Sequence, residues 1–120
     1  MNQPLRIGVL GAARITPMAL VRPAREVEVV RIVAVAARDE ARARAFAGKH
    51  GIPRVHGSYA ALLADPEVDA VYNPLPNSHH GVWTIRALEA GKHVLCEKPL
   101  AANAEEAEAM AAAARACGRV

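Results

Sequence analysis

The sequence predicts an α/β fold of the doubly wound type, in which helices cover both faces of a parallel sheet. Short apolar runs that indicate buried strands alternate with helical stretches along the chain. Glycine, proline and helix-capping residues separate these segments. With 120 residues and no linker, repeat or low-complexity tract, residues 1–120 are expected to form one domain.

The first three elements follow from apolar runs and from the two prolines between them. Leu5–Leu10 is an apolar run that predicts a buried first strand. A short helix is expected from Ile15 to about Arg22, with Pro17 in its first turn and Pro23 at its end. The valine-rich stretch 27–36 predicts the second strand.

Capping residues delimit the next three elements. Asp39 is expected to cap a helix that runs to about His50, where Gly51 ends it. Residues 54–56 predict a brief third strand. Ser58 is expected to cap a short helix that runs through Leu63.

The remaining elements alternate in the same way. Residues 69–73 and 93–96 predict the fourth and fifth strands. Between them, Asn77 or Ser78 is expected to cap a helix through residue 90, which Gly91 ends. The last helix begins after Asn103, with Glu106 completing a capping box, and ends at residue 118. An apolar stripe marks its buried face: Ala107, Met110, Ala111, Ala114 and Cys117.

Composition and charge argue against several classes of protein. The net charge of +3 is small and its acids and bases are interspersed, so no nucleic-acid partner is expected. No apolar run approaches membrane-spanning length, and no signal peptide opens the chain. Two cysteines without metal-ligand spacing indicate a reduced, cytoplasmic protein with no metal site.

The turn after the first strand has the layout of a dinucleotide-binding loop. It consists of Gly11, Ala12, Ala13, Arg14 and Ile15, before Thr16. Such a loop turns tightly, lets phosphate approach the backbone and directs helix N–H groups at the anion. Ala13 and Thr16 occupy positions where the second glycine and third small residue usually stand. An ordinary strand-to-helix turn is the alternative interpretation.

The end of the second strand bears on the choice between NAD and NADP. In a dinucleotide fold, an acid at this strand tip binds the ribose 2′-hydroxyl and repels a 2′-phosphate. Here the tip is Ala37, and Arg38 follows it, which favours a phosphate and hence NADP. The alternatives are a solvated Arg38 and a ribose-binding role for Asp39, which we expect to cap the next helix instead.

Two further stretches carry a family resemblance. They are residues 72–80, Tyr-Asn-Pro-Leu-Pro-Asn-Ser-His-His, and residues 90–100, which contain a Glu-Lys-Pro triplet after Ala-Gly-Lys-His. With the opening loop they make the chain resemble the cofactor half of the Gfo/Idh/MocA oxidoreductases, a family with a Rossmann-type domain. The resemblance implies a sheet of about five strands in order 3-2-1-4-5. It also implies a chain truncated before the sixth strand and the C-terminal α/β domain.

The resemblance also implies site residues. It implies contacts with the cofactor, NADP in preference to NAD, from the loop after the fourth strand: Pro74, Leu75, Pro76, Asn77 and His80. Glu97 and Lys98 should lie near the nicotinamide, and Lys98 is the catalytic candidate, since a partly desolvated lysine there can serve acid–base chemistry. Ala13 and Ala37 depart from the glycine and serine common in the family.

The function that the sequence predicts is hydride transfer between a nicotinamide cofactor and a sugar, polyol or diol. The cofactor supplies the redox chemistry, and the protein positions it. The substrate domain is expected to lie outside this chain, and the full-length protein is expected to be a homo-oligomer. Left alone, the fifth strand would form an open edge. A non-catalytic dinucleotide-binding fragment or sensing module, and a domain for another phosphate ligand, are the alternatives.

Overall fold

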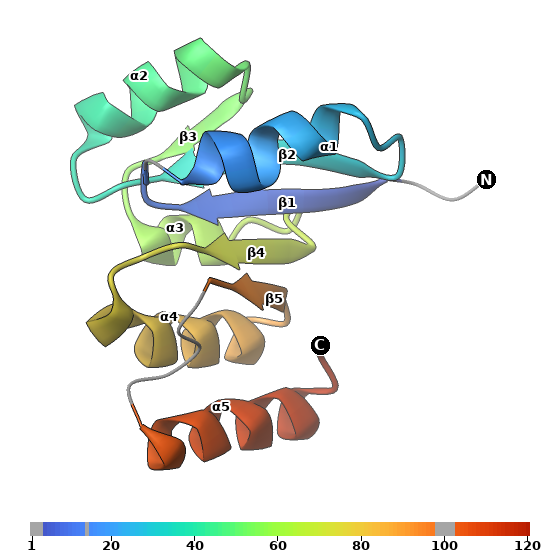
Figure 1. Cartoon of the computed structure of the whole chain (residues 1–120), viewed down its shortest axis with the longest axis vertical. Coiled ribbons are helices and arrows are strands. Elements are labelled where there is room, and N and C mark those ends of the chain that lie inside the picture. The colour runs from blue at the N-terminus through green and yellow to red at the C-terminus, as the bar shows by residue number, and fades with distance from the viewer. Residues whose placement is uncertain (1–3, 14, 98–102) are drawn as a thin grey trace.

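The fold is a five-stranded parallel sheet with helices on both faces (Figure 1). This computed structural model describes residues 4–13, 15–97 and 103–120. The strand order is β3-β2-β1-β4-β5, as predicted. The strands are β1 (Leu5–Leu10), β2 (Val30–Ala36), β3 (Arg54–His56), β4 (Ala70–Asn73) and β5 (His93–Cys96). The helices are η1 (Pro17–Val21), α1 (Arg22–Arg25), α2 (Glu40–His50), α3 (Tyr59–Leu63), α4 (Asn77–Glu89) and α5 (Ala104–Cys117).

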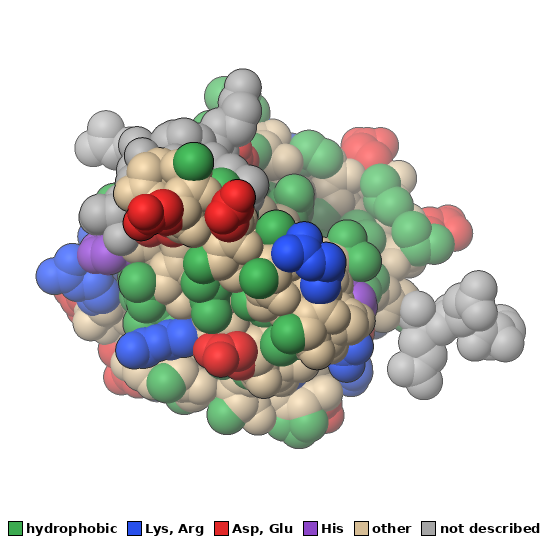
Figure 2. Space-filling model, turned by 90° about the horizontal axis from the view of Figure 1, so that it is seen from below, with side chains coloured by type: hydrophobic (Ala, Val, Ile, Leu, Met, Phe, Trp, Pro, Cys, Tyr) green, Lys and Arg blue, Asp and Glu red, His purple; other side chains and the backbone are tan. Residues whose placement is uncertain are grey.

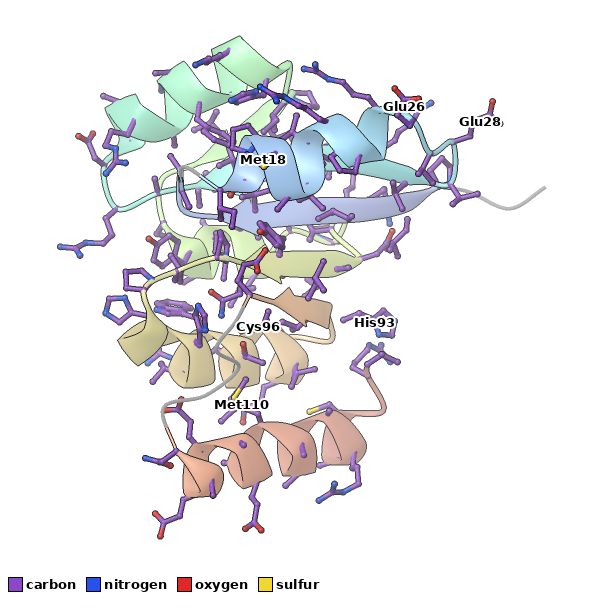
Figure 3. The ribbon with its side chains drawn as sticks, viewed as in Figure 1. Met18, Glu26, Glu28, His93, Cys96 and Met110 are labelled. Carbon is purple, nitrogen blue, oxygen red and sulfur yellow. The ribbon has the colours of Figure 1, made fainter. Side chains whose placement is uncertain are left out.

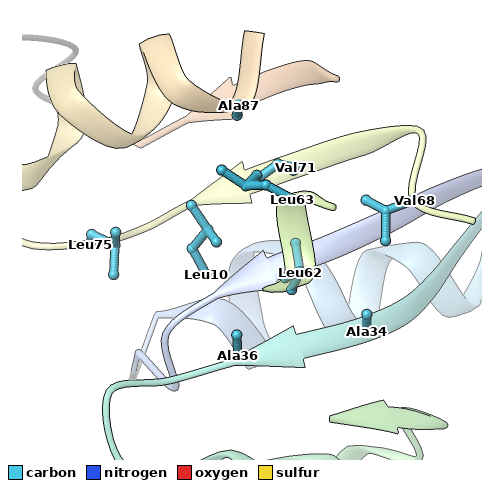
Figure 4. Packing of buried hydrophobic residues seen from close by; sticks show 9 residues of the cluster. All are labelled: Leu10, Ala34, Ala36, Leu62, Leu63, Val68, Val71, Leu75 and Ala87. Carbon is cyan, nitrogen blue, oxygen red and sulfur yellow. The ribbon is translucent and has the colours of Figure 1, made fainter. Parts of the chain in front are cut away.

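Two hydrophobic cores sandwich the sheet, because alternate strand residues point to opposite faces. On one face, side chains of β1, β2 and β4 pack with α3 and α4: Leu10, Ala34, Ala36, Leu62, Leu63, Val68, Val71, Leu75 and Ala87 (Figure 4). On the other face, they pack with η1 and α2: Ile7, Val9, Leu20, Val35, Ala47, Ile52, Ala70 and Tyr72. Gly8 permits the close packing of α3 on the first of these faces, since an added Cβ would lie 2.8 Å from Leu62 Cδ2.

The first helix is longer than predicted, because Pro23 does not end it. A π-helical turn, η1, leads directly into α1, which continues to Arg25. Proline interrupts an α-helix through its missing N–H and its clash with the carbonyl four residues back. The wider π turn before Pro23 is a known way to accommodate such an interruption.

Two predicted strands begin later than expected. The N–H groups of Glu26 and Val27 bind the carbonyls of Pro23 and Ala24, so this segment forms a turn and β2 starts at Val30. β4 starts at residue 70, one residue later than predicted, although Asp69 still donates its N–H to the carbonyl of Arg6 at 2.8 Å.

Side-chain caps begin three helices as predicted, and a fourth was predicted wrongly. Asp39, Ser58 and Asn103 accept hydrogen bonds from backbone N–H groups at 2.9, 3.0 and 2.8 Å. In α4, by contrast, the N-cap is Pro76 rather than Asn77 or Ser78. Proline suits a helix start because its φ is already near the helical value and an N–H there has no partner in the helix.

Strand β5 forms one edge of the described sheet. Val94 N–H donates to the carbonyl of Val120 at 2.8 Å, so the edge is occupied at this position rather than fully open. Helix α5 packs against α4, where Met110 is buried while Ala111, predicted in the buried stripe, is exposed. Seen from the α5 side, charged and hydrophobic side chains are interspersed (Figure 2).

Candidate functional site

The loop after β1 turns as a dinucleotide-binding loop must. Gly11 has a φ of +81°, a conformation that favours glycine. A Cβ there would also lie 3.0 Å from Leu75 Cδ2, so the loops after β1 and β4 pack closely. Position 11 is therefore restricted to glycine by both backbone conformation and space.

The rest of this loop leads into the helix start. Ala12 and Ala13 are half-buried, whereas Ile15 is 49% exposed. Thr16 is fully buried, and its N–H donates to the carbonyl of Ala13 at 3.3 Å. Arg14 lies outside the described residues. The small residues leave the backbone of the loop open to a ligand before the N-terminus of η1.

At the end of β2 no acid occupies the strand tip. Ala37 is buried and Arg38 is exposed. The carboxylate of Asp39 is committed to capping α2 through Ala41 N–H at 2.9 Å. This confirms the capping role and argues against a ribose-binding role for Asp39.

Asn73 shapes the loop after β4. This side chain is fully buried, and its amide nitrogen donates to the carbonyl of His80 at 3.2 Å and to Thr84 Oγ1 at 3.0 Å. Its amide oxygen accepts from Leu75 N–H at 3.2 Å. One buried amide therefore ties the end of β4, the loop and α4 together.

Most of the predicted cofactor residues line one hollow of about 380 Å³ between the loops after β1, β2 and β4. The predicted ones among them are Gly11, Ala12, Ala13, Ala37, Arg38, Pro74, Leu75 and Pro76. The hollow lies outside the carboxyl ends of the strands, where open α/β sheets bind ligands. No acidic residue is among the described residues that line it.

Sequence reasoning missed two residues of this hollow, Arg42 and Tyr59. Arg42 lies in the first turn of α2, and its guanidinium donates to the carbonyl of Ala12 at 3.5 Å. Helical spacing could not have linked it to Arg38, because Arg38 precedes the N-cap Asp39 and lies outside the helix. The pKa of Tyr59 is raised by burial, while the nearby Arg38 opposes that rise.

A second hollow, of about 410 Å³, shares Ala37, Arg38 and Tyr59 with the first. Trp83 forms part of its wall, and its ring meets that of Tyr59 edge-on with centroids 5.0 Å apart. The guanidinium of Arg86 lies 4.8 Å from the Trp83 ring centroid. This aromatic pair gives the Arg38 side of the site a rigid wall.

At the end of β5, Glu97 is held by a residue that sequence analysis left without a role. The Tyr72 hydroxyl donates to Glu97 Oε2 at 2.5 Å, and Glu97 N–H donates to the carbonyl of Asn73 at 3.0 Å. Burial, and then the Glu97 carboxylate, raise the pKa of Tyr72 well above its ordinary value, so the phenol stays a proton donor. Lys98, the catalytic candidate, lies outside the described residues.

Three predicted residues are not in the hollow. Ile15 and Glu97 are absent from its lining, and His80 is 1% exposed in the first turn of α4. Asn77 is the first residue of α4, and its side chain is not among those that the structure describes. Cofactor contacts by these residues stay predictions.

Within the described part of the chain, no group of three or more His, Cys, Asp or Glu side chains could hold a metal ion. Nor does any helix described there have the length and apolar character to cross a membrane. Cys96 is half-buried, and burial raises the pKa of its thiol, which does not favour a nucleophilic thiolate.

The residues present fit a dinucleotide. Small side chains expose the backbone at a helix start, two arginines face the same hollow, and an aromatic ring borders it. Together with the strand order, this site defines a dinucleotide-binding domain of the Rossmann type. Comparison with known families agrees: residues 5–120 match the model of Gfo/Idh/MocA, described as an oxidoreductase family with an NAD-binding Rossmann fold. The chain belongs to this family.

Named relatives show the range of the family. The chain is 49% identical over 106 residues to a D-xylose 1-dehydrogenase (NADP(+)) of Haloferax volcanii, covering 88% of this chain and 32% of the relative. It is 44% identical over 118 residues to trans-1,2-dihydrobenzene-1,2-diol dehydrogenase of Bos taurus, covering 95% and 34%. The chain therefore spans about a third of the length of these relatives.

A solved structure supports the fold directly. KijD10, a 3-ketoreductase from Actinomadura kijaniata crystallised with NADP and TDP-benzene, superposes with a TM-score of 0.92 at 42% sequence identity. The match covers 98% of this chain and 36% of that chain. The fold of this chain is thus similar to that of a domain in a structure that holds NADP.

Proposed function

We propose that this chain is the NADP-binding domain of an oxidoreductase that moves hydride between the nicotinamide and a sugar, polyol or diol carbon. The observation that carries the cofactor preference is the pair Arg38 and Arg42 at a hollow whose described lining has no acid. Two guanidinium groups suit a 2′-phosphate, whereas NAD binding commonly uses an acid at the strand tip.

The hollow suggests how the chain divides the work of binding. The backbone of Gly11–Ala13 and the helix start behind it would receive the pyrophosphate. Arg38 and Arg42 would receive the 2′-phosphate, and Tyr59 would border the adenosine. The hydrogen bond from Arg42 to the Ala12 carbonyl already connects the arginine pair to the loop after β1. Both anionic parts of the ligand would therefore meet positive groups at one wall.

For catalysis, the proposal rests on the end of β5. Lys98 would hold or deliver the proton at the reacting oxygen, while Tyr72 fixes Glu97, the preceding residue in the sequence, through the 2.5 Å hydrogen bond. Bound NADP would supply the hydride chemistry.

Relatives named as a xylose dehydrogenase, a dihydrodiol dehydrogenase and a 3-ketoreductase support the substrate class. A substrate domain outside residues 1–120 would complete the pocket in a cytoplasmic homo-oligomer.

Titration calorimetry with NADP⁺ and NAD⁺ tests the proposed cofactor choice. The chain should bind NADP⁺ more tightly than NAD⁺. Arg38→Ala should weaken NADP⁺ binding by about 10- to 150-fold, the equivalent of one charge-assisted contact, and leave NAD⁺ binding nearly unchanged.

Arg44→Ala is the matched control. Arg44 lies on α2, the helix that follows Arg38, is 65% exposed and pairs only loosely with Glu40 at 3.7 Å. This variant loses the same charge outside the hollow, so its NADP⁺ affinity should stay near that of the wild type. Equal affinities for NADP⁺ and NAD⁺ in the wild type and in Arg38→Ala would contradict the proposed preference.

A further inference from the structure

A second kind of hollow lies at the end of the sheet opposite the cofactor loops. It is an open groove of about 710 Å³ between the end of α1, the start of β2 and the turn before β3. We call it the amino-end groove, because it lies at the amino ends of the strands, at the right of Figure 1. Its volume is within the range of small-molecule sites.

The groove exists because two neighbouring elements are short. β3 pairs with β2 only from Ala34 to Ala36, so residues 30–33 of β2 have no strand beside them on that side. The helix on this face ends at Arg25, before it reaches the start of β2. Neither β3 nor this helix covers the first residues of β2.

Apolar side chains make up most of the groove's walls. They are Val21, Ala24, Val27, Val30, Ile32 and Val33. Val21 is nearly buried, at 4% exposed, whereas Val27 at the rim is 43% exposed. The groove therefore has an apolar floor that reaches the surface and would gain from covering.

Basic residues are also part of the groove's lining. Arg25, Arg31 and His50 line the groove. Arg25 and Arg31 are exposed and form no ion pair among the residues that the structure describes. Burial, and then the charges of Lys49, Arg25 and Arg22, lower the pKa of His50. Among the described residues that line the groove, one is an acid, Glu28, which lies with Glu26 at the turn between α1 and β2 (Figure 3).

We propose that the amino-end groove is a second ligand site, which binds an apolar carboxylate: a hydrocarbon chain or ring with one carboxylate group. The hydrocarbon would lie on the valine-rich floor, and the carboxylate would meet Arg25 and Arg31, with the His50 ring beside them. That ring is held by Phe46, whose centroid is 4.5 Å away. This site does not depend on the proposed cofactor function.

A small molecule fits the groove better than an added peptide strand or a second copy of the chain. The unpaired stretch of β2 is only four residues, and the wall opposite it contains Pro53, which has no N–H to offer a strand. A second copy would bring the same cations against Arg25 and Arg31. An amphiphilic anion could contact both the apolar floor and the basic side chains of the groove.

Titration with octanoate, octylammonium and octanol, followed by backbone amide NMR, tests the proposal. Octanoate should bind saturably, with shifts confined to residues 21–33 and 50–53, and at least about tenfold more tightly than octylammonium or octanol. The double variant Arg25→Gln/Arg31→Gln should lose at least about tenfold in octanoate affinity. Arg44→Gln, which removes a charge elsewhere on the surface, should keep it.

NADP⁺ binding separates failure of this site from failure of the fold. The double variant should bind NADP⁺ as the wild type does, since neither arginine lines the cofactor hollow. Equal affinity for octanoate and octylammonium would overturn the proposal. So would octanoate binding that survives the double substitution, shifts at other residues, or groove shifts that appear on raising the protein concentration without ligand, which would indicate a second copy.

Discussion

Adjacent residues at the end of β2 have separate tasks. Arg38 is exposed toward the hollow, while the Asp39 carboxylate is taken up by the first turn of α2. An acid next to a phosphate site would weaken it, but a carboxylate that accepts a backbone N–H is directed at the helix. The cap therefore directs the Asp39 carboxylate away from the arginine pair, and this division underlies the proposed NADP preference.

Asp65 is the residue whose charge most affects stability with pH. Its side chain is 3% exposed and accepts hydrogen bonds from Glu67 N–H at 2.8 Å, His56 at 2.9 Å and Arg54 at 3.0 Å. Burial alone would raise the pKa of Asp65, but these partners outweigh it and lower the pKa from 3.8 to about 2. The folded state thus favours the ionised carboxylate.

A lowered carboxyl pKa stabilises the fold above the unfolded pKa and loses that effect as pH falls through the folded one. We predict that the free energy of unfolding loses about 2 kcal/mol of Asp65-dependent stability between pH 5 and pH 2. Urea unfolding of the wild type and Asp65→Asn across this range measures it. The variant should be less stable at pH 5 and lose less on acidification. Parallel pH profiles would contradict this role.

At the scale of elements, the loop after β1 carries a prediction of its own. A branched side chain at position 13 would cover the backbone that a pyrophosphate must approach. Ala13→Val should therefore abolish measurable NADP⁺ binding while keeping the circular dichroism spectrum. Ala112→Val on the exposed face of α5 makes the same change away from the loop and should bind normally. Unchanged affinity in Ala13→Val would place the ligand elsewhere.

The elements that the sequence predicted best are those with strong local signals. Strands of continuous apolar residues, such as Leu5–Leu10, and helices with a side-chain cap, such as the one after Asp39, have the expected bounds. Two of the errors came from prolines. Pro23 lies inside a helix whose π turn no local pattern predicts, and Pro76 took the cap position expected for its polar neighbour.

The candidate site shows the same limit. The loop residues from Gly11 to Ala13 and the pair at the end of β2 were predicted, because each follows its strand directly. Tyr59 was missed, because it follows β3 and reaches the hollow only through the pairing of β3 with β2. The bond from Tyr72 to Glu97 was missed for the same reason, since it joins β4 to the end of β5.

For the molecule as a whole, binding and turnover should be separable. The hollow needs only the loops of this domain, whereas hydride transfer also needs an oriented substrate, which can contribute roughly 7–11 kcal/mol to lowering the barrier. The 120-residue chain should therefore bind NADP⁺ and show no measurable oxidation of xylose, inositol or a cyclic diol. Absorbance at the reduced-cofactor band checks this. Robust turnover would contradict the division between cofactor and substrate domains.

The central claim is that the chain holds a dinucleotide at the carboxyl ends of β1, β2 and β4. Backbone amide NMR during titration with NADP⁺ tests it most directly. We expect saturable shifts at Gly11–Ala13, Ala37, Arg38, Tyr59 and Leu75, with the amides of residues 27–33 at the opposite end of the sheet unchanged. The absence of saturable shifts, or shifts confined to residues 27–33, would contradict it.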